Sequence, residues 1–204
     1  MQVLGIVGGI ASGKTLVSEV FGELGAVVLS GDRIAHEVLS EPVVLAAARD
    51  RWGDLVLDER GQVDRSQLAA IVFGETPTAR EELGFLENLT HPQVHERICQ
   101  ALEQLREEEV GVVLLDVALL LKTDWNPLCE KIIFLDTPLK RRQEYAALRG
   151  WDAGQLARRE ACQLPLESKR SQADFVLHNS GDLVRLREEI RRVWDSLFGP
   201  QMPN

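Results

Sequence analysis

The sequence predicts an α/β protein whose parallel sheet is covered by helices on both faces. Five short apolar runs, each bounded by glycine or charged residues, predict buried strands over residues 3–7, 26–29, 112–115, 131–135 and 175–178. Segments with helical periodicity lie between most of these runs. Because strands that alternate with helices pair in parallel, one parallel sheet is expected.

A helix is expected soon after the first strand. An apolar stripe with the i, i+3, i+4, i+7 spacing of one helix face is formed by Val17, Val20, Phe21 and Leu24. Gly25 follows as the type of residue that ends helices. The first strand, the loop, this helix and the second strand are therefore expected to form one compact β-loop-α-β unit.

The loop of this unit reads GGIASGKT over residues 8–15 and satisfies the phosphate-binding pattern G-x-x-x-x-G-K-[ST]. Glycines let backbone N–H groups approach phosphates, and a helix N-terminus favours anions. Lys14 is expected to contact the β- and γ-phosphates, and the Thr15 hydroxyl to ligate Mg²⁺. The residues predicted to bind nucleoside triphosphate here are Gly9, Ile10, Ala11, Ser12, Gly13, Lys14, Thr15 and Leu16.

Two aspartates follow strands that end at the same sheet edge as this loop. Asp32 comes after the second strand and is placed to orient an acceptor hydroxyl and take its proton, although an N-cap of the helix starting near Arg33 is the alternative. Asp116 ends the third strand as a Walker B carboxylate would, reaching Mg²⁺ through water or contacting the acceptor. A plain strand-ending aspartate is the alternative for Asp116.

More than eighty residues separate the second strand from the third, which predicts a helical insertion. Proline and glycine cut this stretch into short helical pieces, such as residues 67–73 and 79–89. Such insertions commonly hold a second substrate. A final helix over residues 182–197 is expected to pack on the core, because its apolar residues lie on one stripe.

Residues 137–170 form a basic segment within an acidic chain. The segment holds eight Lys and Arg against four Asp and Glu, a charge of 8 − 4 = +4, whereas the whole chain carries −9. A helical hairpin of this kind suits a lid that closes arginines over phosphates, and a solvated face is the alternative. The overall negative charge predicts that neither nucleic acid nor a membrane is a partner.

Composition gives no sign of export or of a structural metal. No apolar stretch approaches the roughly 20 residues of a spanning helix, and the N-terminus lacks signal-peptide features, so a cytoplasmic location is expected. The three cysteines form no C-x-x-C pair, and no further ligand completes a metal set with His91 and His95. No feature of the sequence indicates an oligomeric state.

Several ordered segments resemble the dephospho-coenzyme A kinase family over nearly the whole chain. The family's opening G-G-I-x-S-G-K matches residues 8–14, and its D-x-I-A matches residues 32–35. In the insertion, residues 61–68 and 86–92 resemble G-x-L-D-R-x-x-L and L-E-x-I-x-H-P. Matches farther along the chain, in the family's order, are Arg159, Gln163, Lys169, Ala173, Asp174 and Asn179.

The resemblance implies transfer of the γ-phosphate of ATP to the ribose 3′-hydroxyl of dephospho-coenzyme A, with Mg²⁺. It implies that Asp32 acts as base or orienter, and that Arg142 and Arg149 are lid arginines acting with Lys14. His91 of the insertion would help to hold the acceptor, with Asp116 nearby, and Asn179 would lie on the ATP-adenine side. The implied division is a core of residues 1–35, 97–136 and 171–204, an insertion of 36–96, and a lid of 137–170.

The chain departs from the family pattern at five positions, which are Leu16, Ser30, Ala118, Lys122 and Tyr145. Tyr145 stands where the family usually has an arginine, so Arg141 or Arg142 must take that role or it is absent. Two further hypotheses therefore stand beside the leading one. One is a P-loop kinase for another small acceptor, and the other is a degenerate nucleotide-binding protein without turnover.

Overall fold

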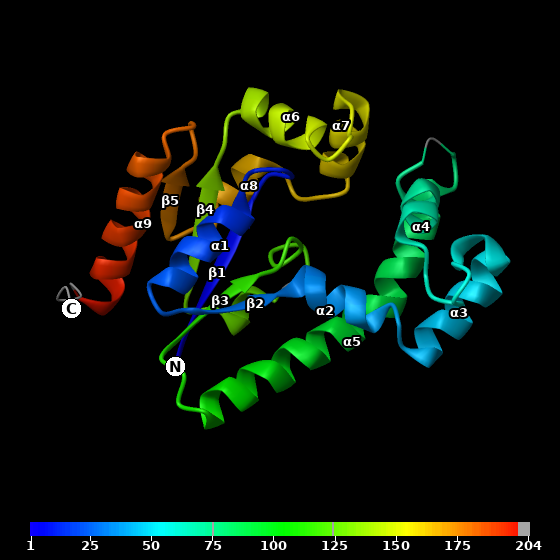
Figure 1. Cartoon of the computed structure of the whole chain (residues 1–204), viewed down its shortest axis with the longest axis horizontal. Coiled ribbons are helices and arrows are strands. Elements are labelled where there is room, and N and C mark those ends of the chain that lie inside the picture. Colours follow the sequence, from blue (N-terminus) through cyan, green and yellow to red (C-terminus); the bar gives the residue numbers. More distant parts are fainter. Residues whose placement is uncertain (75, 124, 200–204) are drawn as a thin grey trace. The chain divides into compact units, whose positions relative to one another are not determined.

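The computed structural model of the chain describes residues 1–74, 76–123 and 125–199 (Figure 1). Within these residues five strands form one parallel sheet in the order β2-β3-β1-β4-β5. The predicted parallel sheet is confirmed, and every predicted run is a strand. The strands are β1 (Gln2–Gly8), β2 (Val27–Ser30), β3 (Val112–Asp116), β4 (Lys131–Asp136) and β5 (Phe175–His178).

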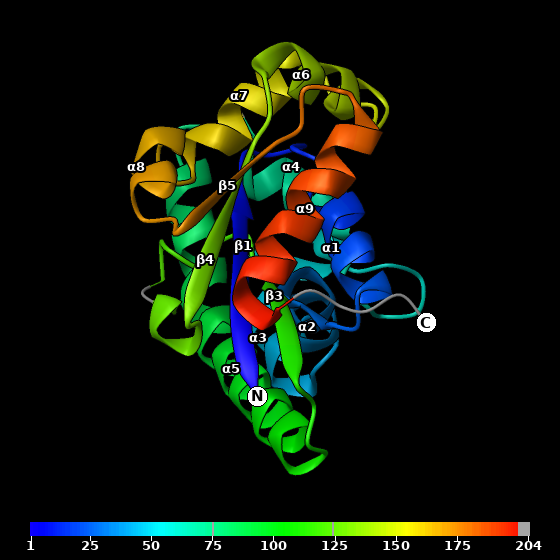
Figure 2. The same cartoon turned by 90° about the vertical axis from the view of Figure 1, so that its left-hand side faces the viewer.

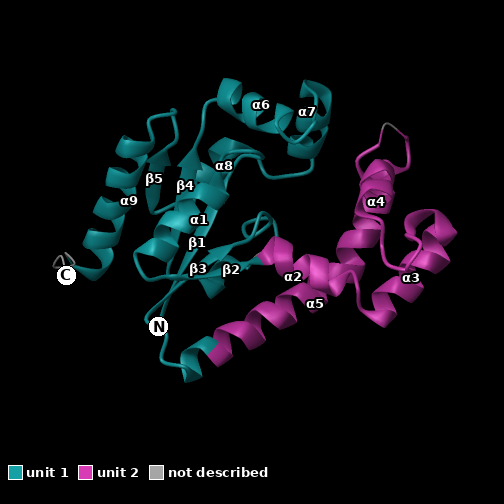
Figure 3. Ribbon diagram, in the orientation of Figure 1, with its two compact units in different colours: residues 1–30, 105–204 teal, residues 31–104 magenta. Residues whose placement is uncertain are grey.

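The chain divides into two compact units, which Figure 3 colours separately. The first unit comprises residues 1–30 and 105–204 and contains the whole sheet. The second unit comprises residues 31–104, and the regular structure among its described residues is helical apart from one isolated bridge between Leu57 and Val63. Among the described residues, no helix is both long enough and apolar enough to cross a membrane.

One face of the sheet in the first unit is covered by α1 (Lys14–Glu23) and α9 (Leu183–Phe198), which lie side by side in Figure 2. The apolar core between them and the strands includes Leu4, Ile133 and Leu177, all fully buried. Phe21 and Trp194 meet there with ring centroids 6.2 Å apart. Burial of this apolar surface is the main stabilising contribution to the unit.

The sheet register brings the carboxyl ends of the strands to one edge. Ser30 and Ile6 both pair with Asp116, and Gly8 pairs with Leu135 one residue before β4 ends. The loop after β1 therefore starts at the edge where β2, β3 and β4 end. In open parallel sheets this edge is where ligands bind.

Three helices connect β4 to β5 in the first unit. They are α6 (Leu139–Ala147), α7 (Ala153–Ala161) and α8 (Leu166–Ser171). The start of α7 is fixed by a capping box, because the Asp152 carboxylate accepts from the Gln155 N–H and the Gln155 side chain accepts from the Asp152 N–H. Helix α8 packs against β1, which brings the end of this basic segment close to the sheet.

The second unit consists of α2 (Gly31–Val38), α3 (Pro42–Trp52), the short 3-10 helix η1 (Gly53–Val56), α4 (Arg65–Val72) and most of α5 (Ala79–Glu107). Trp52 packs edge-on against Phe85 at 5.3 Å, and its indole N–H donates to Glu82 at 2.8 Å. These contacts tie α3 to α5. Arg51 adds charge-assisted hydrogen bonds to Glu81 and Glu82.

The predicted short helix over residues 79–89 is wrong in extent, because α5 continues through Pro92 to Glu107. Proline removes one helical N–H and crowds the preceding turn, which usually ends a helix. Here side chains bond carbonyl groups of that turn: the Thr90 hydroxyl donates to Leu86 O at 2.8 Å, and the Gln93 amide donates to Leu89 O at 3.0 Å.

Replacing Phe21 by Ala removes a fully buried ring from the core between α1 and α9. We expect the free energy of unfolding to fall by about 3–5 kcal/mol, the usual loss for an aromatic-to-alanine change in a core. Urea denaturation followed by tryptophan fluorescence measures this loss. Leu148→Ala is the control, since Leu148 is 84% exposed and should change the free energy little. Equal effects of the two substitutions would contradict the assigned core.

Candidate functional site

The loop between β1 and α1 takes two left-handed backbone turns. Gly13, the N-cap of α1, has φ +92, and Ala11 has φ +56. A Cβ at position 13 would lie 2.7 Å from the Asn179 amide nitrogen, so the glycine is required both by its φ and by its neighbour. Successive turns of this kind direct backbone N–H groups towards one concave, anion-binding surface.

The loop is held in place through the carbonyl group of Ser12. The Thr137 hydroxyl donates to this oxygen at 2.8 Å, and the Asn179 amide donates to it at 2.9 Å. Thr137 follows β4 and Asn179 follows β5, and both are buried. Two strand ends thus fix the loop backbone, and Asn179, predicted on the ATP-adenine side, lies against the loop itself.

Lys14 and Asp116 lie next to each other at this edge of the sheet. The Lys14 ammonium lies 3.8 Å from one carboxylate oxygen of Asp116, and the Ser18 hydroxyl donates to the other at 3.4 Å. Thr15 is exposed in the first turn of α1, and Leu16 is half-buried against the core. A hydroxyl and a carboxylate at this edge are oxygen donors of the kind that Mg²⁺ prefers.

The two predicted lid arginines occupy different environments. Arg142 on α6 is buried: its Nε donates to Thr137 O at 3.2 Å, and its guanidinium pairs with Glu160 of α7. It packs on the loop so closely that a Cβ at Gly9 would meet its Cδ at 2.9 Å. Burial lowers the pKa of Arg142. Arg149 is exposed.

Two further side chains lie in or just after α6, Tyr145 within it and Arg149 two residues beyond its end. The Arg149 guanidinium lies 5.7 Å from the Trp151 ring centroid, within cation-π range. Tyr145, at one of the positions that depart from the family pattern, accepts a hydrogen bond at 2.9 Å from Arg141. Of the arginines that could replace the missing one, Arg142 is therefore the one that lies on the loop.

Lys169 belongs to the site, but its role was not recognised from the sequence. It is 3% exposed, and its ammonium donates to Gly8 O at 3.0 Å and to the Gln163 side-chain oxygen at 2.6 Å. Burial, with smaller contributions from Lys14 and Arg142, lowers the pKa of Lys169 to about 8. The family resemblance includes Lys169 and Gln163, but nothing in the local sequence pattern shows that this lysine is buried against the loop.

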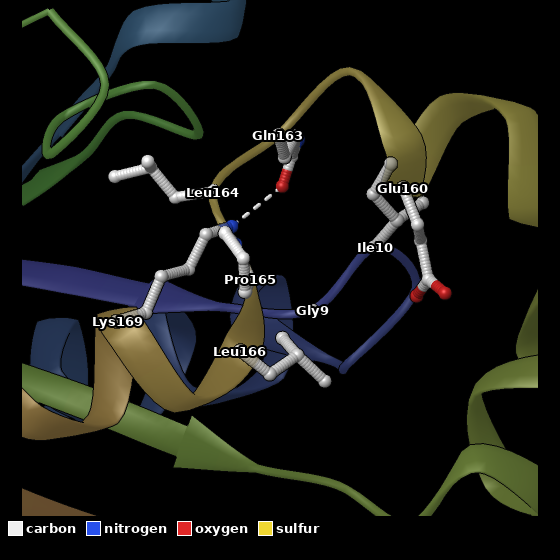
Figure 4. Close-up of a pocket in the computed structure, with 8 residues that line it drawn as sticks. All are labelled: Gly9, Ile10, Glu160, Gln163, Leu164, Pro165, Leu166 and Lys169. Carbon is white, nitrogen blue, oxygen red and sulfur yellow. Dashed lines mark hydrogen bonds between the residues drawn. The ribbon is translucent and has the colours of Figure 1, made fainter.

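Beside the loop lies a pocket of about 210 Å³, shown in Figure 4. Its polar wall comes from Lys169, Gln163 and Glu160, and the loop contributes Gly9 and Ile10. The remaining wall is apolar and consists of Leu164, Pro165 and Leu166. The pocket therefore combines loop backbone, a cation and an apolar surface next to the phosphate-binding pattern.

Asp32 and His91 lie in the second unit. Asp32 is exposed in the first turn of α2, two residues after β2 ends. The alternative that Asp32 is an N-cap is wrong, because α2 begins at Gly31, before it. His91 is half-buried on α5, and no cluster of three metal-binding side chains occurs among residues 1–74, 76–123 and 125–199.

With a phosphate-binding loop at the carboxyl edge of its parallel sheet, the chain is a protein of the P-loop kinase type. A crystal structure from Thermus thermophilus has a TM-score of 0.78 and 29% identity, covering 97% of this chain and 98% of that one. The structure of dephospho-CoA kinase from Campylobacter jejuni shares the fold, with a TM-score of 0.65, 24% identity, and coverage of 96% and 97%.

The chain belongs to the dephospho-CoA kinase family. The model of this family matches residues 2–185. The dephospho-CoA kinase of Carboxydothermus hydrogenoformans is 34% identical over 93% of this chain and 91% of its own length. That of Thermobifida fusca is 35% identical over 97% and 96%. The resemblance inferred from the sequence motifs is thereby confirmed.

Replacing Gly13 by Ala tests the loop geometry. The substitution places a methyl group against Asn179 and imposes a left-handed φ on alanine, so we expect the affinity for ATP to fall by about tenfold or more. Calorimetric titration with ATP measures it. Gly25→Ala is a matched control, because Gly25 has φ +106 but no atom within 4 Å of its added Cβ. An unchanged affinity in Gly13→Ala would contradict the assigned loop.

Proposed function

We propose that the protein transfers the γ-phosphate of ATP to the ribose 3′-hydroxyl of dephospho-CoA, producing coenzyme A and ADP. Membership of the dephospho-CoA kinase family over residues 2–185 is the observation that carries this proposal. The reaction is the last step of coenzyme A biosynthesis. The loop and Lys14 keep a geometry suited to binding phosphate, which favours an active enzyme over a degenerate nucleotide-binding protein.

The triphosphate is held, on this proposal, by the backbone N–H groups of the loop and by the Lys14 ammonium. The Lys14 ammonium lies 3.8 Å from Asp116, and on ATP binding it would exchange this carboxylate for phosphate oxygens as its anionic partner. Thr15 and Asp116 are the residues that would hold Mg²⁺, Asp116 through water. When bound, Mg²⁺ supplies charge neutralisation at the phosphate oxygens.

Asp32 is proposed to orient the acceptor hydroxyl and to accept its proton. A general base must reach the hydroxyl that attacks the phosphate. The carboxylate of Asp32 is exposed, so an acceptor can approach it. His91 is proposed to hold the acceptor from α5. The insertion of residues 36–96 would then bind the acceptor, while the core of residues 1–35, 97–136 and 171–204 binds ATP.

Residues 137–170 are proposed to act as a lid. Arg142 already lies on the loop, and Arg149 is an exposed cation in the same segment. Closure would bring arginines to the transferred phosphate and exclude water. The proposed partners are the small molecules ATP and dephospho-CoA, with neither nucleic acid nor membrane, and the proposed location is the cytoplasm.

Asp32→Asn should lower kcat with dephospho-CoA by about 100- to 10,000-fold, the usual contribution of a general base. The affinity for ATP should stay near that of the wild type, since the change leaves the phosphate-binding loop intact. Acceptor-dependent release of ADP measures kcat, and calorimetry measures binding. Asp50→Asn, an exposed carboxylate on α3 of the same unit, is the control. Full turnover in Asp32→Asn would overturn the base assignment.

Thr15→Val tests the proposed metal ligand without relying on turnover. Loss of the hydroxyl should weaken ATP binding in the presence of Mg²⁺ by about tenfold, whereas binding in a chelator should not change. Thr15→Ser keeps the hydroxyl and serves as the control. If valine and serine variants bind Mg·ATP equally well, Thr15 is not a ligand.

The acceptor itself is tested with the wild-type protein. ADP release should require dephospho-CoA and should stay at background with adenosine, shikimate or gluconate. If ADP were released with another acceptor but not with dephospho-CoA, the protein would instead be a P-loop kinase for that small molecule. ATP binding without release for any acceptor would support the degenerate nucleotide-binding protein.

A further inference from the structure

Lys169 joins two parts of the first unit that are far apart in sequence. Its ammonium contacts Gly8, the first residue of the loop pattern and 161 positions away, and Gln163, which follows α7. Figure 4 shows the side chain rising from α8 to this contact, with the ammonium at the pocket wall. One side chain thus links the start of the loop to the end of the basic segment.

The setting of Lys169 is costly for a cation. The side chain is 3% exposed, and both hydrogen-bond acceptors are neutral: a backbone carbonyl and an amide. Burial without a carboxylate partner disfavours the ammonium. Lys14 and Arg142 each have an acidic neighbour, Asp116 and Glu160, within the described structure.

A bound triphosphate would change this balance of charge. Lys14 and Arg142 both act on Lys169 electrostatically, which places three cations around the loop. Anionic oxygens in the loop would offset their mutual repulsion, because a nearby opposite charge favours the charged form of a lysine. Lys169 would therefore be more firmly protonated, and its bonds to Gly8 and Gln163 stronger, with nucleotide than without.

We propose that Lys169 is a positioning residue for phosphoryl transfer. By bonding both Gly8 and Gln163, it holds the loop and the end of the basic segment in a fixed arrangement around the triphosphate. The proposal rests on the proposed kinase function, but it assigns to this lysine a role that the phosphate-binding pattern does not include. It acts through Gly8 and Gln163 rather than through contact with the transferred group.

The charged groups around Lys169 determine how it should titrate. They are Lys14 on α1, Arg142 on α6, Glu160 on α7, and Glu167 and Arg170 on α8 itself. Gly8, Gly9 and Ile10 of the loop bring no charge. Because the pKa of Lys169 is lowered to about 8, the ammonium is present below this pH and is lost as the pH rises through it. ATP affinity should fall over the same range.

The experiment compares ATP affinity by calorimetry and kcat by ADP release between pH 6.5 and 9.5. Lys169→Met should bind ATP about 10- to 100-fold more weakly at pH 7 and should lose the decline in affinity near pH 8. Lys169→Arg should recover part of the affinity without that decline, because arginine does not titrate in this range. The matched control is Lys131→Met, because Lys131 is a half-buried lysine at the opposite end of β4 that pairs with Asp174 and not with the loop.

Gln163→Leu tests the proposal through the pH at which the ATP affinity declines, a quantity that a merely structural contact would not change. Loss of one acceptor removes stabilisation of the ammonium, so the decline in ATP affinity should shift to lower pH. The proposal is overturned if Lys169→Met keeps the decline near pH 8, or if its affinity equals that of Lys131→Met. It is also overturned if Gln163→Leu leaves the decline in place.

Failure of the proposed function would be visible separately. If the wild-type protein released no ADP with dephospho-CoA, the acceptor assignment would fall, while the ATP affinities of the Lys169 and Gln163 variants would still test the positioning role. If Lys169→Met did not fold, Lys169→Arg and Gln163→Leu would carry the test alone through the same pH profile of ATP affinity.

Discussion

The carbonyl oxygen of Ser12 is the point on which the whole site depends. It accepts hydrogen bonds from Thr137 and Asn179, which follow two different strands, and both donors are buried. A buried carbonyl with two well-placed donors is strongly fixed, because the loss of either leaves a polar group unsatisfied. The strained turns at Ala11 and Gly13 on either side are kept in place by this anchor. The N–H groups of the loop are thus oriented before any phosphate arrives, so less ordering is required on binding.

Two cations beside this loop are paired with carboxylates, and bound phosphate could replace those carboxylates as their partners. Lys14 lies near Asp116, and Arg142 pairs with Glu160, so each of these two cations has a carboxylate neighbour within the protein. Lys169 has neutral partners only among the described contacts. An acidic chain of net charge −9 can therefore hold a local cluster of cations next to the binding edge. The carboxylates offset the charge of these cations, and an anionic ligand could share the cations with them.

The sheet and the loop could be predicted from the sequence because each leaves a local pattern. Buried parallel strands are continuous apolar runs, and the loop needs glycine, lysine and threonine at fixed spacing. The continuation of α5 through Pro92 could not be predicted, because proline usually ends a helix and no local pattern marks this exception. The role of Lys169 and the anchor at Ser12 were missed for another reason. Both depend on contacts between residues more than a hundred positions apart, which no local pattern encodes.

The anchor at Ser12 also has a consequence for how the protein is made. Its two donors lie 125 and 167 positions after Ser12, and the second follows β5, the last strand of the sheet. A ribosome adds residues from the N-terminus onward, so the loop is synthesised before either donor and gains its second support only after β5 has been made. A nascent chain therefore carries the loop without either of these supports while the next 125 residues are added. The loop backbone gains both of its side-chain supports only once β5 has joined the sheet.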